Sequence, residues 1–158
     1  MTNRLEYDIV RVQPYIKWIY FFHAWEMNGK PEAEKLRLRD DAEKMLSVFQ
    51  KRYHTYAVFR LFDANSDGDD LLLDGVRLPM LRQQHPSAPD APCLCLADFV
   101  RPLSSGIADR VGAFATSVDH AMETDFASDP YERMLAQTLA DRLAEATAER
   151  MHLEVRRT

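Results

Sequence analysis

The longest helical pattern lies at the C-terminal end of the chain, and it constrains the fold more than any other feature. Apolar residues recur there every three, four or seven positions, the spacing of one face of an α-helix. Pro130 suits the first turn of such a helix because an N–H at that position has no helical partner. We predict one long helix from about Pro130 to Arg156, with a buried stripe of Leu135, Leu139, Leu143, Ala146 and Leu153.

Two further helices are expected near the N-terminus. The first runs from about Gln13 to Met27 and ends at Asn28-Gly29, where glycine suits a left-handed cap. Its apolar positions make it hydrophobic nearly all round; they are Ile16, Trp18, Ile19, Phe21, Phe22 (or His23), Trp25 and Met27. The second begins at Pro31 and runs to about Arg52. Its expected core face is Leu36, Ala42, Met45, Leu46 and Phe49.

The middle of the chain favours strands. Residues 53–62 are rich in aromatic and aliphatic side chains, and residues 69–78 predict a hairpin that turns at Asp74-Gly75. Further strands are expected at about Cys93–Ala97 and Arg110–Thr116. The sum is an α+β fold, in which an antiparallel sheet is flanked by N-terminal helices and a long C-terminal helix. At 158 residues, a single domain spanning residues 1–158 is expected.

Charge and hydropathy exclude several classes of protein. A net charge of -5 argues against nucleic-acid binding, which needs a concentrated basic surface. No apolar run approaches the roughly 20 residues needed to cross a bilayer, and the N-terminus lacks the apolar segment of a secretory signal. Cys93 and Cys95 alternate with Leu94, a spacing that does not favour a disulfide between them. We therefore expect a cytoplasmic protein with reduced cysteines and no membrane attachment.

The start of a calcium-binding EF-hand loop is suggested by oxygen-bearing residues at alternating positions before a glycine. The residues concerned are Asp63, Asn65, Asp67 and Gly68, with Asp74 at the last loop position. However, Asp70 stands where an apolar residue is usual, and Gly75 and Pro79 disfavour the helix that should follow. We predict a connection between strands and no metal site.

No catalytic group is predicted from the residues themselves. The histidines show no metal-ligand spacing, and no glycine-rich phosphate-binding loop is present. Ser104-Ser105-Gly106 lacks the strand-turn-helix setting of a nucleophile elbow. Each histidine is interpreted as an ordinary surface or core residue.

A series of segments, taken in order, resembles the activation domain of cobalamin-dependent methionine synthase. The segments are residues 81–84 (LRQQ), 95–100 (CLADFV), 105–106 (SG), 112–115 (GAFA) and 139–146 (LADRLAEA). The resemblance covers about Tyr15 to Arg157. It implies a module that binds S-adenosylmethionine and helps return an oxidised cobalamin to service.

The resemblance also implies roles for two acids on the last helix. Glu145 would accept a hydrogen bond from the α-amino group of S-adenosylmethionine, a charge-assisted contact. Asp141 would approach the histidine of a cobalamin-binding domain after that histidine has left cobalt. Their spacing of four puts both on one helical face. Without the resemblance, both would be interpreted as solvated acids opposite Leu139 and Leu143.

Two departures from the family pattern lead us to expect weak or lost S-adenosylmethionine binding by this chain alone. Lys17, ahead of Trp18, stands where bacterial members often carry an aspartate that contacts the ligand, and we expect its charge to repel the sulfonium and amino groups. The family's Arg-Pro-x-x-Gly-Tyr segment, which holds the carboxylate and adenine of the ligand, is expected beyond Thr158.

Two hypotheses for function remain open from the sequence. The first is an accessory domain in cobalamin-dependent methionine synthesis that is not catalytic alone. Its partners would be a cobalamin-binding domain or protein and a flavodoxin-type reductant. The alternative is a structural or interaction homologue that has lost S-adenosylmethionine binding and forms homo-oligomers through an exposed apolar surface.

Overall fold

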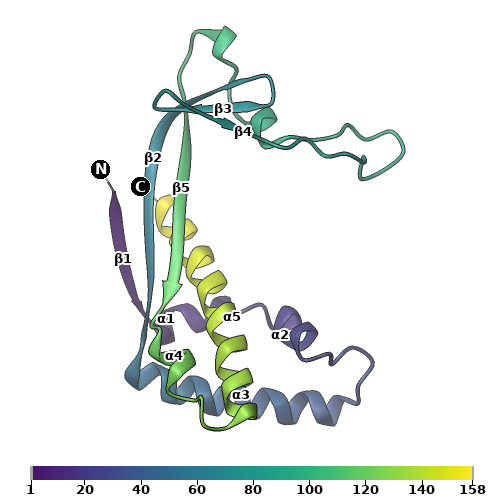
Figure 1. Ribbon diagram of the computed structural model, residues 1–158, viewed down its shortest axis with the longest axis vertical. Coiled ribbons are helices and arrows are strands. Elements are labelled where there is room, and N and C mark those ends of the chain that lie inside the picture. Colours follow the sequence, from purple (N-terminus) through teal and green to yellow (C-terminus); the bar gives the residue numbers. More distant parts are fainter. Residues whose placement is uncertain (1, 158) are drawn as a thin grey trace. The chain divides into compact units, whose positions relative to one another are not determined.

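The computed structural model describes residues 2–157 and has the predicted α+β architecture (Figure 1). Its sheet has five strands, in which β2 pairs with β1, β3 and β5, and β3 pairs with β4. The strands are β1 (Asn3–Asp8), β2 (His54–Asp67), β3 (Asp70–Leu73), β4 (Val76–Pro79) and β5 (Asp109–Val118). The predicted strands near residues 53–62 and 110–116 and the predicted hairpin at residues 69–78 are confirmed.

The chain forms two compact units, which β2 and β5 both traverse. Thr2 and residues 59–114 form the hairpin unit, which contains β3 and β4. Residues 3–58 and 115–157 form the helical unit, which contains the five α-helices of the described residues. These are α1 (Ile9–Val12), α2 (Trp18–Ala24), α3 (Glu32–Arg52), α4 (Ala121–Thr124) and α5 (Pro130–Val155).

Helix α5 follows the predicted bounds closely. Asp129 caps its N-terminus, because the carboxylate accepts a hydrogen bond of 2.8 Å from the backbone N–H of Glu132. The predicted stripe is fully buried at Leu135, Leu139, Leu143 and Ala146, whereas Leu153 is only partly buried. The buried stripe leaves the opposite face of α5 for polar contacts.

The predicted first helix is wrong in its bounds and its buried face. The chain instead forms a 3₁₀ turn, η1 (Gln13–Tyr15), passes through extended backbone at Ile16 and Lys17, and starts α2 at Trp18. Aromatic and β-branched residues are weak helix formers, so packing decides where this segment is helical. The break resets the helical register: Phe21 is fully buried, whereas Ile19 is 62% exposed.

Helix α3 confirms the second predicted helix, with one error in its core face. Leu36 is 57% exposed, and Leu38 is buried instead. Leu38 continues the face of Ala42, Met45 and Phe49 at helical spacing, whereas Leu36 lies off that face. The remaining predicted core positions of α3 are buried.

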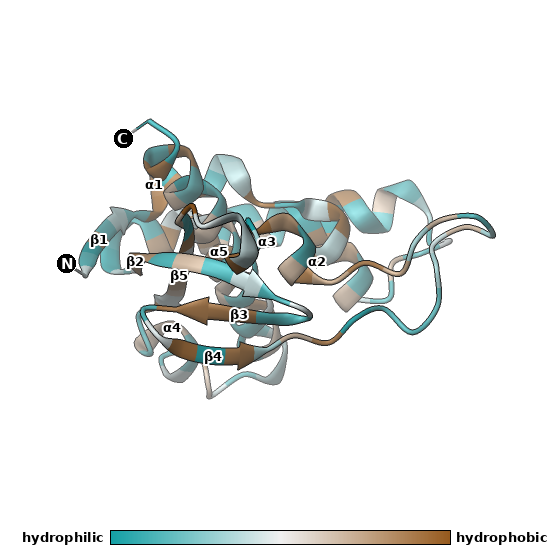
Figure 2. Cartoon of the chain, turned by 90° about the horizontal axis from the view of Figure 1, so that it is seen from above, coloured by the Kyte–Doolittle hydropathy of each residue, from teal (hydrophilic) through white to brown (hydrophobic). Residues whose placement is uncertain are grey.

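The hairpin unit contains a tight turn and a small apolar core. Asp74 and Gly75 both have positive φ angles, 47° and 82°, which match the twist of a two-residue hairpin turn. Figure 2 shows β3 and β4 coloured largely as hydrophobic. The buried cluster consists of Leu71, Cys95 and Ala97, against which Met80 and Val100 pack.

The predicted strand at Cys93–Ala97 is wrong. Residues Leu96–Phe99 form a 3₁₀ turn instead, because the Asp98 carboxylate accepts a hydrogen bond of 2.8 Å from the N–H of Cys95. Cys93 and Cys95 therefore do not share the face of a strand. Both are free thiols, as expected, with Cys95 buried and Cys93 partly buried.

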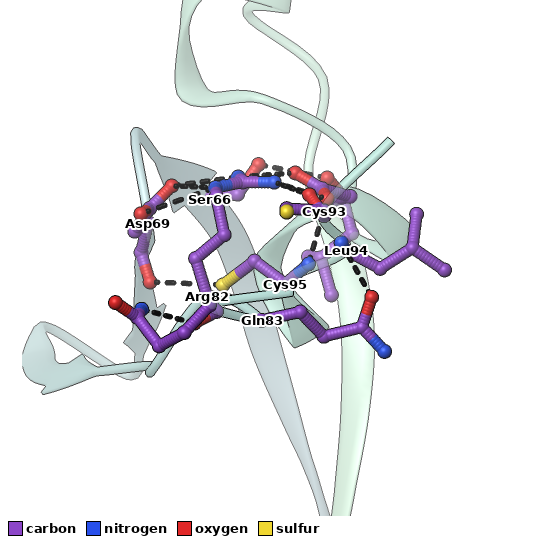
Figure 3. Close-up of polar contacts among 10 residues, drawn as sticks. Ser66, Asp69, Arg82, Gln83, Cys93, Leu94 and Cys95 are labelled. Atoms are coloured by element: carbon purple, nitrogen blue, oxygen red, sulfur yellow. Dashed lines mark hydrogen bonds and ion pairs between the residues drawn. The ribbon is translucent and has the colours of Figure 1, made fainter. Parts of the chain in front are cut away.

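Arg82 holds this part of the hairpin unit together (Figure 3). Its guanidinium donates to the carboxylates of Asp69 and Asp98, each at 2.7 Å, and to the carbonyl of Cys93 at 2.7 Å. The hydrogen bond from Arg82, assisted by the N–H of Cys95, lowers the pKa of Asp98 to about 2. A single side chain thus joins the strand connection at residue 69 to the segment around residues 93–98.

Candidate functional site

The outer face of α5 carries three acidic residues one turn apart. Asp141, Glu145 and Glu149 are spaced four residues from one to the next, so they lie along one side of the helix. Asp141 and Glu145 are exposed and Glu149 is half-buried. The apolar stripe through Leu139 and Leu143 packs into the core and so keeps this acidic side at the surface.

A small groove of about 250 Å³ lies along this side of α5. The segment before and within α2 forms one wall, with Tyr15, Lys17 and Tyr20. Helix α5 forms the other wall, and its lining residues are Glu145, Ala146, Ala148, Glu149 and His152. The volume is below the range of about 300–1,000 Å³ that is usual for small-molecule sites.

Glu145 is held at the groove by a neighbour on the same helix. Nη1 of Arg142 donates to Oε2 of Glu145 at 2.8 Å, and the Arg142 side chain is only 17% exposed. A carboxylate has about four acceptor positions, so this ion pair leaves Glu145 able to accept hydrogen bonds from a ligand. The Glu145 side chain is 56% exposed, which makes that capacity accessible.

Lys17 is paired inside the groove with Glu149, at 2.6 Å between Nζ and Oε1. The hydrogen bond raises the pKa of Lys17 and lowers the pKa of Glu149, so both are charged at neutral pH. Among the lining residues with a fixed charge, Lys17 is positive while Glu145 and Glu149 are negative. One positive and two negative charges leave a net charge of -1. The repulsion expected from Lys17 is therefore offset within the groove.

Of the two predicted site residues, the structure brings one into the groove. Glu145 lines it, whereas Asp141 lies one turn away on exposed helix surface. Sequence reasoning missed Glu149 and His152, although both follow Glu145 at helical spacing and a search along that face would have found them. It also missed Tyr15 and Tyr20, which line the groove from η1 and from α2.

The EF-hand-like residues lie in a strand and its hairpin. Asp67 and Asp70 both pair with Arg77, at 2.7 and 2.6 Å, and Asp74 accepts from Arg60 at 2.8 Å. These carboxylates balance arginines on neighbouring strands. The strand setting and the ion pairs support a structural connection rather than a calcium loop. Within residues 2–157, no group of three or more metal-ligating side chains comes together.

Among residues 2–157, no helix is both long enough and apolar enough to span a bilayer.

Comparisons with known proteins give one family and a close structural neighbour. Residues 8–158 match the family described as "Vitamin B12 dependent methionine synthase, activation domain". The fold is similar to a solved structure described as "Crystal Structure of the MetH Reactivation Domain bound to AdoHcy", with a TM-score of 0.83 and 35% sequence identity. The match covers 99% of this chain and 55% of that chain, so this chain spans about half the length of that one.

Proposed function

This chain belongs to the activation domain family of vitamin B12-dependent methionine synthase, and we propose on that basis that it binds S-adenosylmethionine to assist reductive reactivation of cobalamin. The similar reactivation domain was solved with AdoHcy, the demethylated analogue of S-adenosylmethionine. The observation that carries the proposal is the groove beside α5, where the motif residue Glu145 presents a carboxylate at the surface.

The charges that line the groove support this proposal. Its net charge of -1 favours a ligand with a sulfonium and an ammonium group. Glu145 is the proposed acceptor for the α-amino group, since a carboxylate facing an ammonium makes a strong hydrogen bond. Tyr15 and Tyr20 offer aromatic surface beside it, which attracts cations through the ring faces. Arg142 fixes the orientation of Glu145.

When bound, S-adenosylmethionine supplies the methyl group, and a flavodoxin-type reductant supplies the electron that reactivation requires. The contribution of this chain is to place the donor and to dock a cobalamin-binding domain. Asp141 is the proposed contact for that domain's histidine. It is exposed, and it lies one turn from Glu145 on the same side of α5.

The alternative function, an interaction protein without ligand binding, is not supported by the comparisons, because the similar structure is a reactivation domain in complex with AdoHcy. Weak binding and self-association remain predictions, which titration and sedimentation would measure. We also propose a cytoplasmic location, and the free thiols of Cys93 and Cys95 are consistent with a reducing compartment.

Isothermal titration of the protein with S-adenosylmethionine and AdoHcy tests the ligand. We expect Glu145→Gln to weaken both affinities by about tenfold or more, because it removes the charge from a hydrogen bond to an ammonium. Glu132→Gln is the matched control, since Glu132 is exposed on the same helix outside the groove. Equal affinities for wild type and Glu145→Gln, or absence of binding by wild type, would contradict the proposal.

Asp141 is tested separately by capture of a cobalamin-loaded partner domain. We expect Asp141→Asn to weaken capture while the affinity for S-adenosylmethionine stays unchanged, since Asp141 lies outside the groove. The reverse pattern is expected for Glu145→Gln. If Asp141→Asn changed ligand affinity and left capture intact, the assigned role would be wrong.

A further inference from the structure

A second pocket, of about 410 Å³, lies between α3 and the segment that leads into α2, and is called the α3 pocket below. One wall comes from η1 and the start of α2, with Gln13 and Trp18. The other comes from α3, with Arg39 and Gln50. We propose that the α3 pocket binds a singly charged carboxylate with an apolar body, and that the guanidinium of Arg39 is the anchor. Its volume is within the range of about 300–1,000 Å³ usual for small-molecule sites.

The α3 pocket is separate from the groove beside α5. The backbone is extended at Ile16 and Lys17, so their side chains point to opposite sides of the chain. Ile16 is buried and lines the α3 pocket, whereas Lys17 lines the groove. No described residue lines both. The α3 pocket is therefore a second site, and its occupant need not share the chemistry of a ligand in the groove.

Arg39 supplies the charge of the α3 pocket. It is the one charged residue among the described residues of the lining, which therefore carries a positive charge in a chain whose net charge is -5. A local positive charge of this kind attracts an anion. Glu43, which pairs with Arg39 from the next turn of α3, does not line the pocket but keeps a negative charge close to it. A ligand with one negative charge fits this balance better than a dianion.

Arg39 is held in position by two contacts. Its guanidinium carbon lies 3.4 Å from the centroid of the Trp18 ring, a stacking contact that suits the planar group. Its Nε donates to Oε1 of Glu43 at 2.7 Å. The terminal nitrogens have no hydrogen-bond partner among the described residues, so they offer a carboxylate two parallel N–H donors. The Arg39 side chain is 33% exposed, which leaves these donors within reach of a ligand.

The rest of the lining favours an apolar body behind the carboxylate. Val10, Pro14 and Ile16 provide aliphatic surface, of which Val10 is 58% exposed. Nε2 of Gln50 donates to Oε1 of Gln13 at 2.6 Å and makes a polar end. Gln50 lies about three helical turns, or roughly 16 Å, along α3 from Arg39. The carboxylate is therefore assigned to Arg39, and the aliphatic residues are assigned to the body of the ligand.

The test compares phenylacetate with phenylacetamide, which have the same ring and differ in charge, by NMR titration of the indole N–H signal of Trp18. We expect phenylacetate to shift this signal saturably and to bind about tenfold or more tightly than the amide, because it makes a charge-assisted pair. Arg39→Met should weaken phenylacetate binding by about tenfold or more. Arg39→Lys should recover only part of the loss, since lysine lacks the planar fork. Arg37→Met, at an exposed arginine of α3 outside the pocket, is the control and should leave the affinity unchanged.

Equal affinities for the two ligands, or no saturable shift of the Trp18 signal, would overturn the proposal. So would equal losses of affinity in Arg39→Met and Arg37→Met. If Arg39→Met does not fold, the comparison of the two ligands on wild type decides alone. Inorganic phosphate should bind more weakly than phenylacetate, and tighter binding of phosphate would refute the apolar body. S-adenosylmethionine should not displace phenylacetate, because the α3 pocket and the groove share no described residue, and displacement would refute a separate site.

Discussion

Arg82 shows how much of the hairpin unit depends on one side chain. It bonds to Asp69, Asp98 and the carbonyl of Cys93, three points that are not adjacent in the sequence. The Cys95 thiol adds a contact of 3.6 Å to the carbonyl of Asp69. These segments contain little regular secondary structure, so the hydrogen bonds of Arg82 connect them where backbone hydrogen bonds between strands are absent.

We predict that Arg82→Met raises the pKa of Asp98 from about 2 toward its ordinary value of 3.8. A lowered carboxyl pKa stabilises the fold at pH values above the ordinary pKa, and that stabilisation is lost as pH falls through about 2. NMR titration of the Asp98 carboxyl carbon measures the shift. Arg110→Met, which removes the exposed pair with Asp63, is the control and should leave Asp98 unchanged. An ordinary pKa for Asp98 in wild type would refute this account.

Glu145 was predicted as a site residue from a characteristic run on a helix, and the structure places it in the groove, while its role stays a prediction. The sequence did not indicate Glu149, which also lines the groove. The pairing of Lys17 with Glu149 joins residues 132 positions apart, which no local pattern reports. The sequence alone therefore predicted that Lys17 repels the ligand's positive groups, although in the folded chain Glu149 balances the charge of Lys17.

At the scale of elements, helices with clear ends were predicted well. Helices α3 and α5 have proline near the start and a regular apolar face, and their observed bounds differ from the predicted ones by at most one residue. One failure came where a side chain competes with the backbone. The alternating pattern at Cys93–Ala97 suggested a strand, but Asp98 captures the N–H of Cys95 and turns the chain.

The Asp129 cap leads to a prediction for α5. Asp129→Ala should destabilise the protein by about 1 kcal/mol, because the N–H of Glu132 loses its acceptor at the helix end. Asp129→Asn keeps an acceptor and should cost much less. Urea unfolding followed by circular dichroism measures both. Identical midpoints for wild type and Asp129→Ala would show that the cap contributes nothing.

The corrected core face of α3 leads to a second prediction at this scale. Leu38→Ala should cost about 2–5 kcal/mol, because it empties a buried position. Leu36→Ala should stay within about 0.5 kcal/mol, since Leu36 is mostly exposed. The two leucines differ only in burial, so each is the control for the other. A larger loss of stability for Leu36→Ala than for Leu38→Ala would mean that Leu36 lies in the core, as the sequence predicted.

For the whole molecule, the apolar core is divided unequally between the two units. The largest fully buried side chains, among them Phe21, Phe49, Leu139 and Leu143, belong to the helical unit. The hairpin unit has the small cluster around Leu71 and many exposed apolar residues, including Leu81 and Phe99. The single domain expected from the sequence stays a prediction. The division into two units could not be read from the sequence, because it depends on contacts between distant residues rather than on a local pattern.

This division predicts a gradient in hydrogen–deuterium exchange. Amides in α3 and α5 should exchange slowest, because opening them exposes the main core. Amides in residues 84–92 should exchange fastest, since this segment is exposed along nearly its whole length. Mass spectrometry of peptides along the chain measures both in one experiment, with α5 as the internal reference. Uniform protection across the two units would contradict the prediction.

Strand β4 is an edge strand of the sheet, because β3 is its one strand partner among residues 2–157. An open edge of this kind invites other chains to add strands and aggregate. Here the edge is only four residues long, ends at Pro79, which cannot donate a backbone hydrogen bond, and carries Arg77 in its middle. These features disfavour the addition of further strands at this edge, even though Val76 and Leu78 face solvent.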